Sequence, residues 1–398
     1  MPSQNFSFIV VGGGIGGLAS ALALARIGCS VRVLEKAEIF GEIGAGLELG
    51  PNATRVLQKM GLLEQVLDYA VQPNRLVLKH ALSGIELSAL RVGGSAFRDR
   101  YQAPYVVMHR VDLLNILLDA CRRESLVTLD ANKEVVAVEP LDNGQHVTCA
   151  DGSAYWAQAV VGADGLASRV RELIISDKIV THGFACYRGT IPIEQVRAYA
   201  EVNDVVLWLG PGLHLVQYPV HRGEVYNQVA VFRSPLYQPD KDVMEWGTPN
   251  ELEDAFRPTC PLVKKALSLI GRERKWIMSD REPISRWAVG TVVLMGDAAH
   301  PMLQYLAQGA CQALEDAACL ADKLRAQDFD VGRALTSYEM ERMPRTAAVQ
   351  RNARRFGDIL HTGDDLTIQL RNRVLLGRSD EDCRDVDWLY AYGMEAPK

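Results

Sequence analysis

The first 35 residues change their hydrophobic period twice. Residues 6–11 form a short β-branched and aromatic run, residues 18–27 are rich in Ala and Leu at helical spacing, and residues 30–34 are strand-like again. A strand, a helix and a second strand in this order make a βαβ unit. The pattern therefore predicts an α/β domain at the start of the chain.

The middle of the chain has a different pattern. Residues 180–285 contain short β-rich stretches at 185–190, 205–209, 214–218 and 228–232, which predict a separate sheet. Residues 334–356 combine helical periodicity with dense charge, so we expect a helical region near the C-terminus.

A glycine-rich turn joins the first predicted strand to the first predicted helix. Gly12, Gly14 and Gly17 match GxGxxG, and Glu35 follows at the end of the second strand. In such a turn the glycines permit a tight bend, close approach of a pyrophosphate and helix packing, while the acid accepts hydrogen bonds from ribose hydroxyls. The motif predicts a dinucleotide site but leaves FAD and NAD unresolved.

Two later segments carry related turns. Residues 157–165 read as a strand that enters an Asp-Gly turn at Asp164, with a helix opening near Ser168. Residues 290–301 read as a strand that enters a Gly-Asp turn at Asp297, and a helix begins behind Gly309. Each turn alone is ordinary turn chemistry.

Together, in this order, the three segments resemble the FAD-binding fingerprints of the para-hydroxybenzoate hydroxylase family of flavoprotein monooxygenases. The resemblance implies an α/β fold with a Rossmann-like FAD-binding domain, an inserted β-sheet substrate domain and a C-terminal helical region. The ranges expected for these parts are 1–179 for the first part of the FAD-binding domain, with a substrate-side insertion near 70–105, 180–285 for the β-rich substrate domain, 286–335 for the second FAD-binding part, and 336–398 for the helical region.

The resemblance also implies which residues contact FAD. Asp297 is expected at the ribitol chain, and Asp164 near the flavin pyrophosphate and the path of the nicotinamide. Residues 42–52 either form a flexible loop, as their glycines indicate, or pass the flavin face as in the family. The full set of expected cofactor residues is Gly12, Gly14, Gly17, Glu35, Lys36, Arg110, Asp164, Asp297, Gly309 and Ala310.

Strand alternation predicts that His214, Val216 and Tyr218 share one face of the middle sheet. From the residues alone, the His and Tyr are satisfied groups at a sheet surface as readily as they are ligands of a phenolic substrate. Their segments, with residues 183–190 and 300–310, resemble the branch of the family that hydroxylates 3-hydroxybenzoate. That resemblance places His214, Tyr218 and Gln304 at the aromatic ring, and Tyr105 or Arg188 at the carboxylate, although Arg188 also suits a simple ion pair.

Composition narrows the partners. A net charge of -6 without a basic run gives no support to nucleic-acid binding. We find no apolar stretch long enough to span a membrane and no secretory signal, so we expect a cytoplasmic protein without membrane insertion. Eight scattered cysteines without a CxxC pair predict free thiols and no metal site. Assembly as a homodimer is implied by the family alone.

The expected reaction follows from the resemblance. NADH reduces FAD, O2 adds to give a C4a-hydroperoxide, and the ring is attacked para to its hydroxyl group to yield gentisate (2,5-dihydroxybenzoate). His214 is expected to accept the phenolic proton, because histidine is best poised for this near neutral pH. The alternatives are decarboxylating hydroxylation of salicylate or 6-hydroxynicotinate, an NAD-dependent dehydrogenase, and a flavin-binding sensor without turnover.

Overall fold

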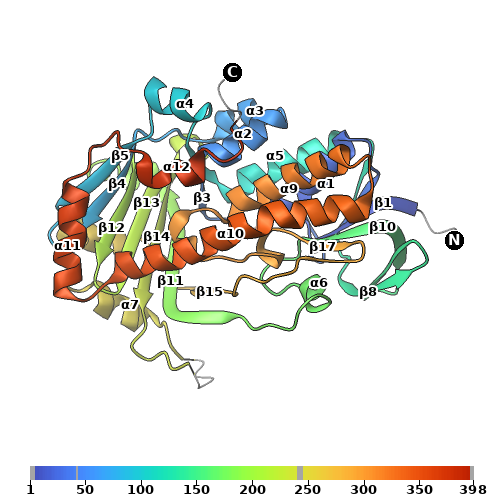
Figure 1. The fold of residues 1–398 in the computed structure, drawn as a ribbon. Helices are drawn as coiled ribbons and strands as arrows, with labels where there is room; N and C mark the ends of the chain where they lie inside the picture. The colour runs from blue at the N-terminus through green and yellow to red at the C-terminus, as the bar shows by residue number, and fades with distance from the viewer. Residues whose placement is uncertain (1–4, 42–43, 240–244, 395–398) are drawn as a thin grey trace.

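Two sheets lie side by side, and one long helix runs along both of them. The computed structural model describes residues 5–41, 44–239 and 245–394. Figure 1 shows the N-terminal sheet and its helices at one end, the second sheet at the other end, and α10 (Val331–His361) crossing between them. At 1.5 Å per residue, a helix of this length spans about 46 Å.

The first sheet contains the predicted βαβ unit. Strand β1 pairs in parallel with β2 on one side and with β10 on the other. Strand β10 in turn pairs in parallel with β17, so three strands far apart in sequence place their carboxyl ends at one edge. The strands of this sheet are β1 (Asn5–Val11), β2 (Val31–Leu34), β7 (Val127–Asp130), β8 (Val135–Leu141), β9 (Gly144–Cys149), β10 (Ala154–Gly162), β16 (Ala288–Val289) and β17 (Val292–Leu294).

Helices cover one face of this sheet, as Figure 1 shows. They are α1 (Ile15–Arg26), α5 (Arg110–Arg123), α9 (Gly309–Ala326) and the first half of α10. Ten of the twelve residues of α1 are buried, because the helix lies between the sheet and its neighbours α5 and α9. A helix enclosed in this way is apolar on most of its surface, which explains its Ala/Leu-rich sequence.

The second sheet has seven strands in the order β15-β11-β14-β13-β12-β4-β5. All neighbours are antiparallel except β12 and β4. The strands are β4 (Arg75–His80), β5 (Glu86–Arg91), β11 (Val180–Pro192), β12 (Val205–Gly210), β13 (Leu213–Val220), β14 (Val225–Arg233) and β15 (Trp276–Asp280). Two strands from the segment near residues 70–105 therefore extend the sheet that the middle of the chain forms.

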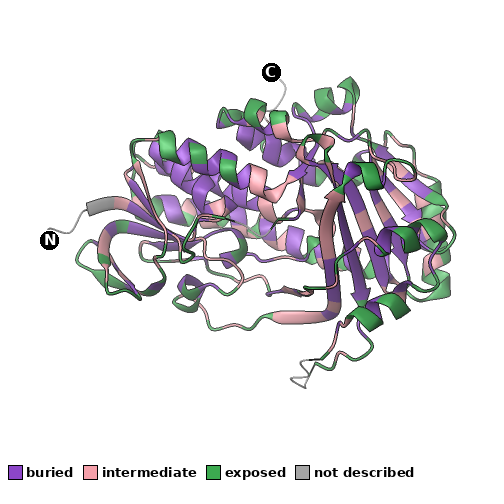
Figure 2. Ribbon diagram, turned by 180° about the vertical axis from the view of Figure 1, so that it is seen from behind, coloured by how far each residue is buried: buried purple, intermediate pink, exposed green. Residues whose placement is uncertain are grey.

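The two faces of the second sheet pack against different partners. Leu213 and Leu215 of β13 join a core with α7 (Pro249–Phe256) and α8 (Pro261–Leu267). Figure 2 shows the strands mostly buried and the helices beside them exposed on their outer sides. The opposite face, which we call the inner face, is turned toward α10, the segment around Tyr305, and the small sheet of β3 (Gly46–Leu49) and β6 (Val106–His109).

The remaining helices have 12 residues or fewer. They are α2 (Pro51–Lys59), α3 (Leu63–Tyr69), α4 (Ser95–Tyr101), α6 (Arg169–Glu172), α11 (Asp365–Leu376) and α12 (Arg384–Tyr390).

All eight cysteines are free and buried, as predicted. Over the described ranges, no helix is long and apolar enough to cross a membrane, and no three His, Cys, Asp or Glu side chains gather as metal ligands.

Candidate active site

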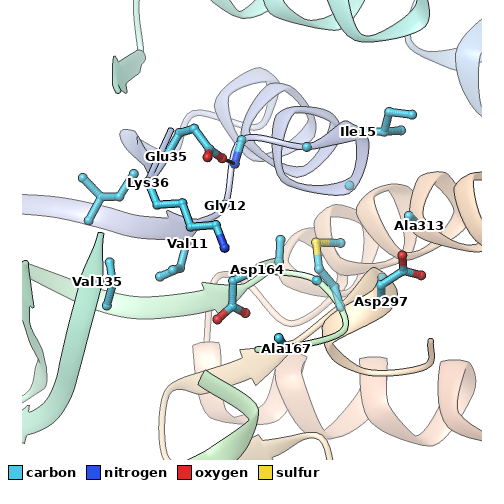
Figure 3. Close-up of a pocket in the computed structure, with 18 of the residues that line it drawn as sticks. Val11, Gly12, Ile15, Glu35, Lys36, Val135, Asp164, Ala167, Asp297 and Ala313 are labelled. Atoms are coloured by element: carbon cyan, nitrogen blue, oxygen red, sulfur yellow. Dashed lines mark hydrogen bonds between the residues drawn. The ribbon is translucent and has the colours of Figure 1, made fainter. Parts of the chain in front are cut away.

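A cleft of about 370 Å³ opens at the carboxyl ends of β1, β2, β10 and β17. This is the edge at which parallel α/β sheets generally bind their ligands. Figure 3 shows Gly12, Glu35, Asp164 and Asp297 converging on it from four separate segments. Nine of the ten expected cofactor residues line this cleft: Gly12, Gly14, Glu35, Lys36, Arg110, Asp164, Asp297, Gly309 and Ala310.

Gly12 and Gly17 shape the first turn and are the positions where a side chain is excluded. Gly12 has φ of +104°, and a Cβ there would lie 2.4 Å from the carbonyl oxygen of Ala163. A Cβ on Gly17 would lie 2.0 Å from the carbonyl oxygen of Gly12. Gly17 does not line the cleft but lets α1 approach the strand end, so that the helix starts beside the cleft.

Glu35 is already engaged by the backbone. Its carboxylate accepts hydrogen bonds from the N–H groups of Gly13 (2.6 Å) and Ala37 (2.8 Å). The acid therefore holds the glycine turn against the end of β2 as well as facing the cleft, where Figure 3 places it next to Lys36. A carboxylate has about four acceptor positions, so two stay available for ribose hydroxyls.

The carboxylates of Asp164 and Asp297 differ in how many hydrogen bonds they accept from neighbouring residues. The Asp164 carboxylate accepts hydrogen bonds from the Ser168 hydroxyl (2.5 Å) and from the N–H of Arg169 (2.7 Å), so it secures the turn before α6. Asp297 is exposed in the cleft, and a Cβ on Gly309 would lie 3.9 Å from its Oδ1. Asp297 thus stands beside the start of α9 with its oxygens turned to the cleft.

The helices α1 and α9 both begin at the cleft without a side-chain cap. Their first N–H groups therefore have no partner within the helix, and the positive ends of the helix dipoles face the same space. Such helix starts bind phosphate and other anions. Glycine backbone at the turn, two open helix starts and an exposed carboxylate make a lining that fits FAD.

A buried ionic network holds the Gly-Asp turn in place behind the cleft. Asp316 of α9 accepts a hydrogen bond from the N–H of Gly296 (3.0 Å) and pairs with His300 (2.6 Å) and Arg342 (2.7 Å). Arg342 is fully buried and also binds Glu315 at 2.5 Å. Despite burial, these partners lower the pKa of Asp316 to about 2, so its charge persists at neutral pH.

His214 and Tyr218 lie on the inner face of β13, as strand alternation predicts. Both are buried, at 3% exposure. The Tyr218 ring lies against β3, where a Cβ on Gly46 would come within 2.5 Å of it. The Nδ1 atom of His214 is 2.7 Å from Nε2 of His361, at the end of α10. The two side chains therefore have different neighbours, although they share one strand face.

The strand register places Arg188 between them. His214 is level with Cys186 across β14, and Val216 is level with Arg188. Residues two apart on a strand are about 7 Å apart, so Arg188 and His214 stand in adjacent rows of the inner face. Burial lowers the pKa of Arg188, and its guanidinium lies 4.3 Å from the Trp276 ring centroid. No acidic side chain in the described ranges forms an ion pair with Arg188.

Asn227 was not expected from the sequence. Its Oδ1 accepts the N–H of Gly46 (2.8 Å), whereas its Nδ2 and the Nε of Arg188 are buried without a hydrogen-bond partner among the described residues. Orphaned donors of this kind are rare in folded proteins and call for an acceptor. The signal in the sequence was a polar residue within the apolar strand 225–233, but its face and neighbours depend on the register with β13.

Tyr105 is committed to another group. Its hydroxyl donates to Glu48 on β3 at 2.5 Å. Glu48 was not singled out in advance, although it falls in the stretch expected at the flavin face; residues 42 and 43 of that stretch lie outside the described residues. Burial raises the pKa of Glu48 against the opposing effect of the Tyr105 hydrogen bond. Tyr105 and Arg188 were both expected to bind the substrate carboxylate, and of the two only Arg188 has a hydrogen-bond donor without a partner among the described residues.

Gln304 comes from a different element than the other predicted substrate residues. It is exposed in a 3₁₀ turn, Gln304–Leu306, just before α9. The next residue, Tyr305, contacts His214 edge-on with ring centroids 5.7 Å apart. The turn thus contacts the inner face through Tyr305, and the place of Gln304 at the substrate stays a prediction.

The chain matches the FAD binding domain family over residues 5–353 and belongs to that family. A variant of HpxO from Klebsiella pneumoniae, solved in complex with FAD, has the same fold with a TM-score of 0.83 at 25% identity, covering 94% of this chain and 96% of that one. The predicted fold class is confirmed, and this protein is a flavoprotein monooxygenase. An NAD-dependent dehydrogenase is thereby set aside.

Two curated relatives extend nearly over the whole chain. The 3-hydroxybenzoate 6-hydroxylase of Polaromonas naphthalenivorans (strain CJ2) is 37% identical and covers 97% of this chain and 96% of its own length. The 3-amino-4-hydroxybenzoate 2-monooxygenase PtnB3 of Streptomyces platensis is 35% identical, with 96% and 95% covered. Both relatives are named for the hydroxylation of substituted benzoates, at different ring positions.

Proposed function

We propose that this protein hydroxylates 3-hydroxybenzoate para to its hydroxyl group and releases gentisate, with NADH and O2 as co-substrates. The observation that carries the proposal is the pairing, in adjacent rows of one buried sheet face, of a cation without an ion-pair partner in the described chain, Arg188, with an imidazole, His214. The similarity to the Polaromonas naphthalenivorans hydroxylase over almost the full length supports the same substrate.

The carboxylate of the substrate is assigned to Arg188 and Asn227. Burying an anion without partners is costly, and both residues have buried nitrogen donors that no described group satisfies. A carboxylate has oxygens enough to accept from both donors. Tyr218, level with Asn227 on the neighbouring strand, bounds the same space with its ring.

His214 is assigned to the phenolic hydroxyl group. Burial lowers its pKa well below the usual value, so the imidazole is neutral near pH 7 and can accept a proton or a hydrogen bond. Nδ1 is engaged with His361, which leaves Nε2 for the substrate. As the O–H proton shifts toward Nε2, electron density rises on the ring carbon para to the oxygen.

The cleft residues hold the cofactor, and the buried setting of His214 and Tyr218 keeps bulk water from the substrate ring. Bound FAD, once reduced by NADH, would react with O2 to give the C4a-hydroperoxide, and this intermediate would supply the electrophilic oxygen. Gln304 is proposed at the ring by resemblance, since its turn directly precedes α9. Homodimer assembly likewise stays a prediction.

The test is incubation of the purified, yellow holoenzyme with 3-hydroxybenzoate, NADH and air. We expect NADH oxidation and O2 uptake in equal amounts and gentisate as the product. His214→Ala should lower the hydroxylation rate about a hundredfold or more while FAD stays bound. His146→Ala, on the hairpin β8–β9 of the other sheet, is the matched control and should keep the rate.

Other products would contradict the proposal in recognisable ways. Loss of the substrate carboxylate as CO2, with salicylate or 6-hydroxynicotinate as the preferred substrate, identifies a decarboxylating hydroxylase instead. A holoenzyme that shows no substrate-stimulated NADH oxidation with any hydroxybenzoate overturns the assignment to this substrate class. Gentisate formation at the wild-type rate by His214→Ala removes His214 from the mechanism while leaving the substrate in place.

A further inference from the structure

His361 is the closest polar partner of His214, and it comes from a distant element. It is the last residue of α10, and its carbonyl accepts a hydrogen bond from the N–H of Gly212 (2.9 Å), which fastens the helix end to the turn before β13. Its Nε2 lies 2.7 Å from Nδ1 of His214, and the two rings lie edge to edge, with 4.9 Å between centroids and 27° between their planes. Neither the expected reaction nor the proposed function uses this residue.

The contact between the two imidazoles decides which nitrogen of His214 is left for a substrate. A neutral imidazole has one N–H and one lone pair, so one ring donates to the other across the 2.7 Å contact. The proposed function requires the lone pair of His214 on Nε2. Its Nδ1 then carries the proton and donates to Nε2 of His361, and Nε2 of His214 is directed away from His361.

Both imidazoles are neutral at physiological pH. Burial and the neighbouring Arg371 lower the pKa of His361 to about 4, and burial lowers that of His214 well below its usual value. When both rings are neutral, a single proton lies between Nδ1 of His214 and Nε2 of His361, so that one ring donates and the other accepts.

Aromatic side chains hold the pair on two sides. Phe184 stacks on His361 at 4.5 Å, and Tyr305 contacts both imidazoles edge-on at 5.2 and 5.7 Å. His361 also borders a second cavity of about 380 Å³. The titratable and charged groups around His361 on its own and neighbouring elements are His214, Tyr305 and Arg371, together with His182, Arg233, Arg354 and Asp358 of the cavity lining.

We propose that His361 is a positioning residue that presents Nε2 of His214, as a lone-pair acceptor, to the hydroxyl group of the substrate. The inference rests on the proposed function, in which His214 accepts that proton. When the substrate O–H bond breaks, the proton moves to Nε2 of His214, and the Nδ1–H bond of the resulting imidazolium still points at the lone pair of His361. No other group is oxidised or reduced in this step.

Three substitutions separate this role from packing. His361→Gln keeps a hydrogen-bond acceptor, His361→Phe keeps the aromatic stack but has no acceptor, and His361→Ala has neither. We expect kcat to fall about ten- to a hundredfold in the Phe and Ala variants, with FAD content unchanged, and to stay within about threefold of wild type in the Gln variant. Arg233→Gln, an exposed residue of the same cavity lining, is the control and should leave kcat unchanged.

A readout without turnover completes the test. 3-Hydroxybenzoate bound to the oxidised holoenzyme should show the red-shifted absorbance of a partly ionised phenol in wild type and His361→Gln, and should lose it in His361→Phe. Added imidazole should restore kcat of His361→Ala, because the space left by the side chain adjoins the second cavity. If His361→Phe has the wild-type rate and absorbance while His214→Ala is inactive, the role of His361 is overturned and that of His214 stands. If His214→Ala keeps the wild-type activity, His214 is not the base, and the proposed function itself loses this residue.

Discussion

The FAD cleft and the proposed substrate site, on the inner face of the seven-stranded sheet, offer different groups to a ligand. The cleft is lined largely by backbone, with glycines at the first turn and two uncapped helix starts. The inner face offers side chains, with Arg188, His214 and Asn227 contributed by three strands. Backbone recognition tolerates changes of side chain but no added Cβ, whereas side-chain recognition depends on each functional group.

The two regions also differ in how polar groups are satisfied before a ligand binds. In the cleft, Glu35 and Asp164 already accept backbone or hydroxyl hydrogen bonds. On the inner face, the Nε of Arg188 and the Nδ2 of Asn227 are buried and still open within the described part of the chain. The cofactor site is therefore largely preformed by its own turns, while the substrate is expected to complete the other site.

The largest effect is expected from Arg342→Ala, which breaks the buried network behind the cleft. Removing this cation leaves Asp316 and Glu315 buried with less compensation, and such losses cost about 3–5 kcal/mol. We expect a loss of that size in the free energy of denaturant unfolding, together with loss of FAD. Arg257→Ala, in an exposed ion pair, should change stability little. Equal stability of the two variants would show that the cleft does not depend on this network.

An intermediate effect is expected from Arg188→Ala on substrate binding. Loss of a charge-assisted hydrogen bond costs about 1.5–3 kcal/mol, so KM for 3-hydroxybenzoate should rise about ten- to a hundredfold. FAD content should not change, because Arg188 lies on the second sheet. Arg274→Ala is a close control, since the exposed Arg274 also lies over Trp276, at 5.2 Å. The assignment fails if both variants bind substrate like the wild type.

A smaller effect on stability, with a selective effect on FAD, is expected from Gly17→Ala. The added Cβ would overlap the carbonyl oxygen of Gly12 and push α1 from the strand end, at a cost of about 1–3 kcal/mol. Flavin absorbance of the purified protein measures the result. Gly363→Ala, where a Cβ meets no heavy atom within 4 Å, serves as its control. Full flavin content in Gly17→Ala would contradict backbone recognition.

Local motifs in the sequence sufficed to predict the cofactor region. The strand and helix periods of residues 6–34 correspond to β1, α1 and β2, and the helix expected behind Gly309 begins at that residue. The middle sheet was also expected, from its short β-rich stretches. The helix expected at 334–356 is longer in the structure, Val331–His361, and its last residue is the one that contacts His214.

Neighbouring residues alone specify the βαβ unit, the three turns of the cleft and the strand face that His214 and Tyr218 share, because turn geometry and strand alternation are local. Folding of distant segments was needed to bind Tyr105 to Glu48, to bury the open donors of Arg188 and Asn227, and to bring His361 to His214. These contacts join elements up to 147 positions apart, so they depend on strand register and helix length rather than on any local pattern.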